Sequence, residues 1–141
     1  GTWDATVEMF MPGAPPMVSK ATEVNTMGCG GLCLISDFKG DFGGMPFHGH
    51  GTSTWDSNKK KYVGTWIDSM SSGLSLSEGT YDAATKKTTS TMEGPDPTGK
   101  IVKSKTVAEY KADNTRVLSM FMTGPDGKDV PTMKISYTKK P

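Results

Sequence analysis

Apolar and polar residues alternate along most of this chain, and this alternation is the feature that most limits its fold. In the first segment Trp3, Ala5 and Val7 share one parity, while Asp4 and Thr6 share the other. Successive side chains of a β-strand point to opposite faces, so the pattern predicts a strand with one buried and one exposed face. No long segment has the period of about 3.6 residues that a helix requires, and the chain is therefore predicted to be all-β.

Turn-forming residues divide the chain into about ten such segments. The expected strands are Thr2–Met11, Val18–Thr26, Leu32–Phe42, Met45–Trp55, Lys61–Met70, Leu74–Tyr81, Lys86–Glu93, Ile101–Lys111, Arg116–Thr123 and Val130–Lys139. Strands of roughly eight to eleven residues, joined in sequence order by short turns, favour an up-and-down closed barrel over a Greek-key sandwich. We expect residues 1–141 to form a single antiparallel barrel domain of this kind.

The charge balance excludes one class of partner. The formal net charge is +1, from 16 basic and 15 acidic residues, and most lysines are scattered. A protein that neutralises several phosphates needs a basic stripe, so nucleic acid is not an expected partner. No apolar run approaches the roughly 18 residues of a membrane helix, so no membrane span is expected. The sequence also has no signal peptide, but a leader could precede Gly1, so cytoplasmic and exported locations both stay open and no oligomeric state is assigned.

The head of the first strand carries a resemblance to a known superfamily. Gly1-Thr2-Trp3 resembles the Gly-x-Trp signature of the calycins, which include lipocalins, fatty-acid-binding proteins and haem-binding nitrobindins. In that superfamily the Trp closes the base of the barrel, and a basic residue from a late strand packs across its ring. The resemblance implies these structural roles for Trp3 and for Arg116, the single arginine, and places any ligand chemistry at the other end of the barrel.

The whole chain is also similar to a bacterial family labelled domain of unknown function 1579. The segments that carry this similarity are Pro12–Met17, Gly44–Phe47, Lys61–Met70, Ser77–Asp82 and Met122–Lys128. The resemblance implies a lipocalin-like fold and no settled activity. One stretch departs from the family pattern, because Gly28–Cys33 contains two cysteines where the family usually has a Gly-Gly-Arg-like turn.

Two cysteines and two histidines form one candidate site. His48 and His50 are two positions apart on an expected strand and therefore share a face. With thiolates from Cys29 and Cys33 they could supply a tetrahedral Cys₂His₂ set for a metal, and either histidine could instead bind haem. The alternatives are two free buried thiols or a small disulfide-closed loop, with both histidines on an outer face. No cofactor is assigned.

Interior carboxylates are a second candidate for chemistry. Asp68 shares the face of Trp66, and Glu78 shares a face with Leu76. A carboxyl group among apolar side chains has a raised pKa and could act as a general acid or base. Equally, Asp68 could cap a turn, and Glu78 could pair with a lysine or a tyrosine hydroxyl. Catalysis on these two residues is the enzymatic alternative, and no catalytic residue is assigned.

The ten methionines favour a binding function instead, because thioethers adapt to irregular apolar shapes. The hypothesis is a barrel that holds a small hydrophobic molecule, with Asp68 or Glu78 as a polar anchor. The expected lining residues are Phe38, Phe47, Trp55, Tyr62, Trp66, Leu76 and Met120. A structural or interaction domain with a packed interior is the third alternative, since the fold alone does not choose among these functions.

Overall fold

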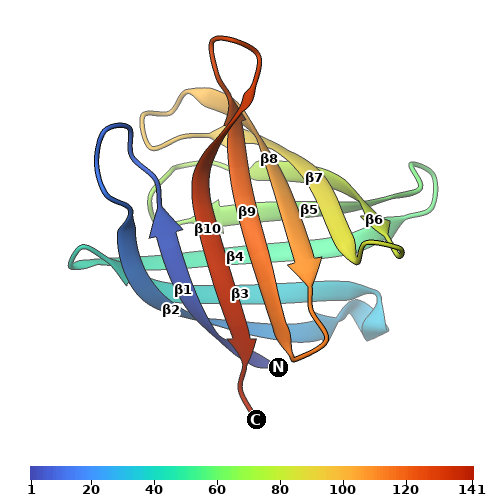
Figure 1. Cartoon of the computed structure of the whole chain (residues 1–141). Helices are drawn as coiled ribbons and strands as arrows, with labels where there is room; N and C mark the ends of the chain where they lie inside the picture. Colours follow the sequence, from blue (N-terminus) through green and yellow to red (C-terminus); the bar gives the residue numbers. More distant parts are fainter.

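The computed structural model describes all 141 residues, and ten strands close into one antiparallel barrel (Figure 1). The strands are β1 (Thr2–Met9), β2 (Met17–Gly28), β3 (Cys33–Phe42), β4 (Met45–Asp56), β5 (Lys61–Asp68), β6 (Ser75–Asp82), β7 (Lys87–Pro95), β8 (Ile101–Tyr110), β9 (Thr115–Thr123) and β10 (Asp129–Lys139). Each strand pairs with its neighbours in sequence, and β1 also pairs with β10. The predicted all-β, up-and-down barrel is confirmed, and a single 3₁₀ turn, η1 (Cys29–Gly31), is its one helical element.

The turns end the strands close to where the sequence predicts. Observed and expected strand bounds differ by at most two residues at either end. One of the largest differences is at β1, which ends at Met9 rather than Met11 because the chain then enters the proline-rich loop from Pro12 to Pro16. Local turn chemistry therefore determines most of the strand boundaries.

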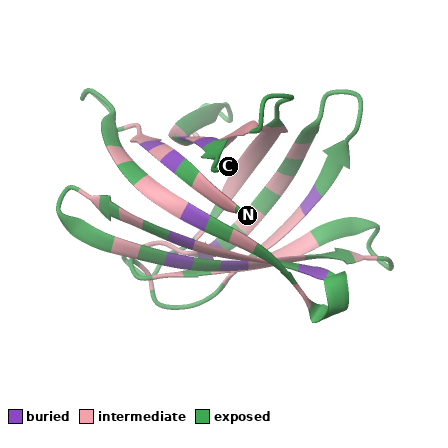
Figure 2. Ribbon diagram, turned by 90° about the horizontal axis from the view of Figure 1, so that it is seen from below, coloured by how far each residue is buried: buried purple, intermediate pink, exposed green.

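The apolar core lies to one side of the barrel interior. Its fully buried members, some of the purple positions in Figure 2, are Ala5, Val7, Phe38, Ile135 and Tyr137. They come from β1, β3 and β10, and the partly buried residues that pack against them come mainly from β1 to β5 and from β9 and β10. By contrast, three inward positions of β6 carry the small residues Ser75, Ser77 and Gly79, which pair with the inward residues of β5. The apolar core thus draws on β1 to β5, β9 and β10 and receives no residue from β6, β7 or β8.

Four methionines occupy adjacent inward positions on four neighbouring strands. Met9 on β1 pairs with Met17 on β2 and with Met133 on β10, and Met133 pairs with Met120 on β9. Directly opposite residues on antiparallel strands lie about 4.5–5.5 Å apart at Cβ, so these side chains are in reach of one another. Met9 and Met133 pack against the core, where flexible thioethers fill irregular space.

Trp66 on β5 enters the core because its neighbour strand has no side chains in the way. Gly49 and Gly51 on β4 lie beneath its ring: a Cβ at Gly49 would overlap the six-membered ring, and one at Gly51 would lie 3.0 Å from Cε3. The indole Nε1 of Trp66 donates a hydrogen bond to Asp68 Oδ2 at 2.8 Å, which satisfies its only polar atom. The two glycines are therefore required by the close approach of an aromatic ring.

Four residues form what we call the closure clamp, on the inner face where the first and last strands meet. The guanidinium of Arg116 lies 4.8 Å from the ring centroid of Trp3 and 3.9 Å from that of Tyr137, and it forms an ion pair with Glu23. Tyr137 donates its hydroxyl to Glu23 at 3.0 Å. Burial, together with the negative charge of Glu23, raises the pKa of Tyr137 far above its ordinary value, so the hydroxyl stays a donor. The clamp connects β9, β10, β1 and β2.

The glycine under Trp66 gives a first prediction. Gly49→Ala should lower the free energy of unfolding by about 1–3 kcal/mol, because a methyl group there forces the Trp66 ring out of its position. Gly51→Ala should cost less, since its nearest ring atom is farther away. Urea denaturation of both variants followed by tryptophan fluorescence measures the difference. Equal or reversed costs would contradict the packing described here.

The closure clamp gives a second prediction. Arg116→Met should destabilise the barrel by about 3 kcal/mol, because it leaves the buried carboxylate of Glu23 without its cation. The matched control is Lys105→Met, which removes a lysine from an exposed ion pair with Asp129 and should cost less than about 1 kcal/mol. Urea midpoints of the two variants test this. A clamp that contributes nothing to closure would give similar values for both.

Candidate functional site

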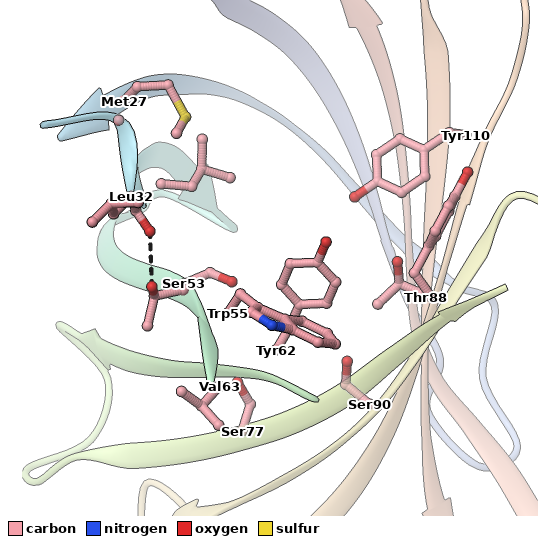
Figure 3. A pocket seen from close by; sticks show the side chains of 14 residues that line it. Met27, Leu32, Ser53, Trp55, Tyr62, Val63, Ser77, Thr88, Ser90 and Tyr110 are labelled. Atoms are coloured by element: carbon pink, nitrogen blue, oxygen red, sulfur yellow. Dashed lines mark hydrogen bonds between the residues drawn. The ribbon is translucent and has the colours of Figure 1, made fainter. Parts of the chain in front are cut away.

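A pocket of about 650 Å³ opens at the end of the barrel where the β2–β3, β4–β5, β6–β7 and β8–β9 hairpins turn (Figure 3). It is lined by strand ends and by one turn, with no contribution from the proline-rich loop at the other end. The 14 lining residues are Met27, Gly31, Leu32, Leu34, Ser53, Thr54, Trp55, Tyr62, Val63, Ser77, Tyr81, Thr88, Ser90 and Tyr110.

Two aromatic pairs shape the pocket. Trp55 and Tyr62 are direct partners on β4 and β5, and their ring centroids lie 5.0 Å apart in an edge-to-face arrangement. Tyr81 on β6 and Tyr110 on β8 form a second edge-to-face pair, with centroids 6.5 Å apart. All four rings stay between 42% and 52% exposed. Aromatic side chains usually bury their large apolar area, so four exposed rings around one cavity mark a surface suited to contact with another molecule.

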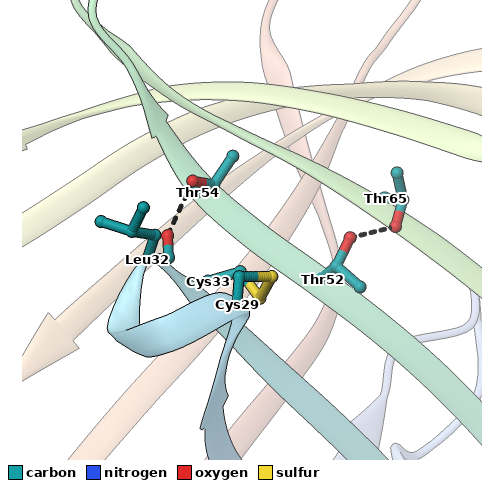
Figure 4. Close-up of a disulfide and its surroundings, with 6 residues drawn as sticks. All are labelled: Cys29, Leu32, Cys33, Thr52, Thr54 and Thr65. Carbon is teal, nitrogen blue, oxygen red and sulfur yellow. Dashed lines mark hydrogen bonds between the residues drawn. A yellow bond between two sulfur atoms is a disulfide. The ribbon is translucent and has the colours of Figure 1, made fainter.

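Hydroxyl groups line the rest of the cavity. Ser77, Thr88 and Ser90 come from β6 and β7, where glycines on neighbouring strands leave them room. A Cβ at Gly64 would lie 2.8 Å from Ser77 Oγ, and one at Gly79 would overlap Ser90 Oγ. One side-chain hydrogen bond joins two lining residues, from Thr54 Oγ1 to the carbonyl oxygen of Leu32 at 2.8 Å (Figure 4). The hydroxyl groups of Ser77, Thr88 and Ser90 are therefore available to hydrogen-bond a ligand.

No charged side chain lines the pocket. Its chemistry is limited to aromatic faces, aliphatic and thioether surface, and hydroxyl groups that donate and accept hydrogen bonds. Such a lining suits uncharged groups better than charged ones, because a charge moved out of water into it would find no opposite charge.

Two of the seven expected lining residues, Trp55 and Tyr62, line the pocket. Four others lie on inward positions but pack away from it. Phe38, Phe47 and Trp66 belong to the core, where the rings of Phe38 and Phe47 lie 5.8 Å apart, and Met120 is a member of the methionine row on β9.

The prediction for β6 was wrong. Leu76 is 57% exposed and Glu78 lies on the same outer face, whereas Ser77 and Tyr81 line the pocket. The alternating pattern of β6 predicts that its larger apolar residue, Leu76, points inward. The register instead pairs Ser75, Ser77 and Gly79 with the inward residues of β5, so Leu76 and Glu78 face outward.

The structure does not bring the two carboxylates together. Asp68 accepts hydrogen bonds from Trp66 Nε1 and from the amide of Met70, at 2.9 Å, so it caps the end of β5 as in the turn-cap alternative. Glu78 forms exposed ion pairs with Lys59 and Lys61, and the hydrogen bond from Lys59 lowers the pKa of Glu78. Neither group lies in the pocket, and the hypothesis of an interior acid–base pair on these residues is wrong.

The Cys₂His₂ hypothesis is also wrong, because Cys29 and Cys33 form a disulfide (Figure 4) and offer no thiolate. His50 Nδ1 hydrogen-bonds Asp37 Oδ1 at 2.9 Å, and His48 Nε2 lies 3.7 Å from the same oxygen. The bond with His50 lowers the pKa of Asp37. Both histidines are about half exposed and outside the pocket, so neither could hold haem there. No group of three or more His, Cys, Asp or Glu side chains is placed to hold a metal ion.

The pocket shares its end of the barrel with the closure clamp. Trp3 and Arg116 lie at the starts of β1 and β9, and Arg116 pairs directly with the pocket residue Tyr110. The pocket therefore lies at the same end of the barrel as Trp3, whereas the superfamily resemblance implies ligand chemistry at the opposite end. The clamp fills the side of this end formed by β9, β10, β1 and β2. The pocket lies on the side formed by the ends of β2 to β8, where serine and threonine hydroxyls and four half-exposed aromatic rings line it.

Sequence reasoning missed Tyr81 and Tyr110, and the available signal was their position. Trp55, Tyr62, Tyr81 and Tyr110 each lie within one residue of a charged strand end or turn on alternate hairpins. In an up-and-down barrel, alternate hairpins meet at the same end. Aromatic residues repeated beside every second turn thus indicate a ring around one mouth.

The chain was compared with known proteins. None of its helical segments is long and apolar enough to cross a membrane. No curated protein matches the sequence. A family model described as Protein of unknown function (DUF1579) matches residues 1–139, which is nearly the entire chain. Together with the sequence segments that run from the first strand to the last hairpin, this match identifies the closed ten-stranded barrel as a member of the DUF1579 family.

Proposed function

We propose that this protein binds a small, uncharged, largely apolar molecule in the pocket beside the closure clamp, as a lipocalin-like carrier would. The observation that carries the proposal is the set of four half-exposed aromatic rings around an uncharged cavity. A volume of about 650 Å³ lies within the range of roughly 300–1,000 Å³ that is usual for small-molecule sites.

Burial of aromatic surface supplies the driving force. Covering apolar area stabilises a complex by about 25 cal/mol per Å², and each exposed ring offers a large, rigid area of this kind. Rings that are already held in edge-to-face pairs lose little freedom when a ligand covers them. Affinity would therefore come mainly from Trp55, Tyr62, Tyr81 and Tyr110.

Hydroxyl groups supply selectivity. Ser77, Thr88 and Ser90 can hydrogen-bond a hydroxyl or carbonyl group of the ligand, and nothing in the lining can neutralise a carboxylate or an ammonium group. The ligand class is thus an uncharged molecule with an apolar body and one or a few hydroxyl or carbonyl groups. The pocket contains no carboxylate, histidine or thiol, and this favours binding over acid–base catalysis.

A titration with the uncharged fluorophore N-phenyl-1-naphthylamine tests the proposal. We expect saturable binding, with Trp55→Ala and Tyr110→Ala each weakening the affinity by about tenfold, which corresponds to the loss of one well-packed aromatic contact. The anionic relative 8-anilinonaphthalene-1-sulfonate should bind more weakly than the uncharged probe.

The matched control is Leu76→Ala, which removes an apolar side chain that is 57% exposed on the outer face of the same barrel wall. This variant should bind the probe like the unaltered protein. Failure of the probe to bind, or equal losses in the Leu76 and Trp55 variants, would show that the pocket is not a binding site.

A further inference from the structure

The Cys29–Cys33 disulfide closes the turn that forms one wall of the pocket. The two cysteines are four positions apart, and between them lie Gly30, Gly31 and Leu32 (Figure 4). Gly31 and Leu32 line the pocket, on the side of Trp55 and the β4 strand end. The bond thus joins the end of β2 to the start of β3 directly behind two lining residues.

The backbone of this turn is one that an ordinary chain does not adopt freely. Cys29, Gly30 and Gly31 have φ values of 55°, 66° and 92°, three left-handed residues in succession. Glycine enters this region readily, but an L-residue such as Cys29 does so at a cost. The turn therefore needs a restraint that holds Cys29 in place.

The other restraints on the wall are few. The amide of Leu32 donates to the carbonyl oxygens of Gly28 and Cys29 at 3.2 and 3.4 Å, and the carbonyl oxygen of Leu32 accepts from Thr54 Oγ1. The side chain of Leu32 contributes little packing, since this residue is 76% exposed. The disulfide is the one covalent bond among these restraints.

A loop this short also limits what the disulfide does for the barrel as a whole. Cross-links that close long loops stabilise a fold most, and this one closes a sequence separation of four. Ten strands with a continuous hydrogen-bonded circuit hold the barrel together independently of it. Its effect is therefore local, on the wall of the pocket.

We propose that the Cys29–Cys33 disulfide is a redox latch for the pocket: in the oxidised protein it holds the Leu32 wall in the binding geometry, and its reduction releases the wall and weakens binding. The inference rests on the proposed ligand-binding function. Pre-organised walls bind more tightly because the ligand does not have to order them. Fixing even one residue of backbone corresponds to an affinity change of about tenfold.

The exchange that opens the latch is a complete thiol–disulfide reaction with a dithiol. Cys29 lies on an exposed turn and Cys33 is buried, so a thiolate attacks the sulfur of Cys29 and displaces Cys33, which takes up a proton. The second thiol of the reductant then attacks the mixed disulfide, releasing Cys29 as a thiol. The protein disulfide is reduced by two electrons, and one dithiol is oxidised to a disulfide.

The test compares the affinity of the full chain for N-phenyl-1-naphthylamine in the oxidised form, after reduction with excess dithiothreitol, and in the Cys29→Ser/Cys33→Ser variant. The reduced form and the variant should both bind about tenfold more weakly than the oxidised form. Reoxidation should restore the probe affinity of the unaltered protein, whereas the probe affinity of the variant should be the same under oxidising and reducing conditions.

Amide hydrogen exchange distinguishes a disulfide that acts only on the pocket wall from one that stabilises the whole barrel. Under reducing conditions, faster exchange should be confined to residues 29–34, with the amides of β1 and β10 unchanged. Faster exchange throughout the barrel would overturn the latch, and so would equal probe affinities in oxidised and reduced protein. An oxidised protein that does not bind the probe would instead contradict the proposed function itself.

Discussion

The barrel depends on one buried ion pair at the seam where its first and last strands meet. Glu23, 6% exposed, would be strongly destabilising inside the barrel without a cation, because a buried carboxylate loses its water. Arg116 supplies the cation across two intervening strands, with Trp3 and Tyr137 beneath its guanidinium. Asn25 donates to Glu23 at 2.8 Å, and Tyr137 donates from the other side. The carboxylate is thereby satisfied only when β9, β10, β1 and β2 are all in register, so the pair specifies closure as well as stabilising it.

The clamp also explains where the cavity lies. It concentrates large side chains on one side of the barrel end, and the core continues from there through Val7 and Phe38. On the other side, small residues such as Ser77, Gly79 and Ser90 occupy inward positions, and Ser77 and Ser90 line the cavity together with the aromatic rings. An interior filled unevenly in this way leaves its empty volume beside the clamp. The superfamily resemblance implies ligand chemistry at the far end, because it locates Trp3 but carries no information on how the interior volume is distributed.

Much of this fold could be predicted from the sequence, because its signals are local. Turn residues such as those around Gly43 and Asp96 mark strand ends, and alternation marks strands. Which face of β6 points inward could not be predicted. A rule that places the larger apolar residue inside selects Leu76, but in the structure Ser77 points inward and Leu76 is exposed. That choice is made by the cross-strand register, which pairs Ser75, Ser77 and Gly79 with the inward residues Trp66, Gly64 and Tyr62 of β5. The disulfide was one of three alternatives for Cys29 and Cys33, because a separation of four permits but does not require a bond.

The same uneven filling makes the pocket wall adjustable where the core is not. Residues such as Phe38 are held by many neighbours, so no single bond controls their position. Leu32 lies on a turn with little packing, and its geometry follows from a disulfide, a threonine hydroxyl and the left-handed backbone between them. A covalent bond has the greatest influence where packing contributes least. A ten-stranded circuit that needs no cross-link can therefore place its only one at the mouth, where a change in redox conditions alters the pocket and leaves the barrel intact.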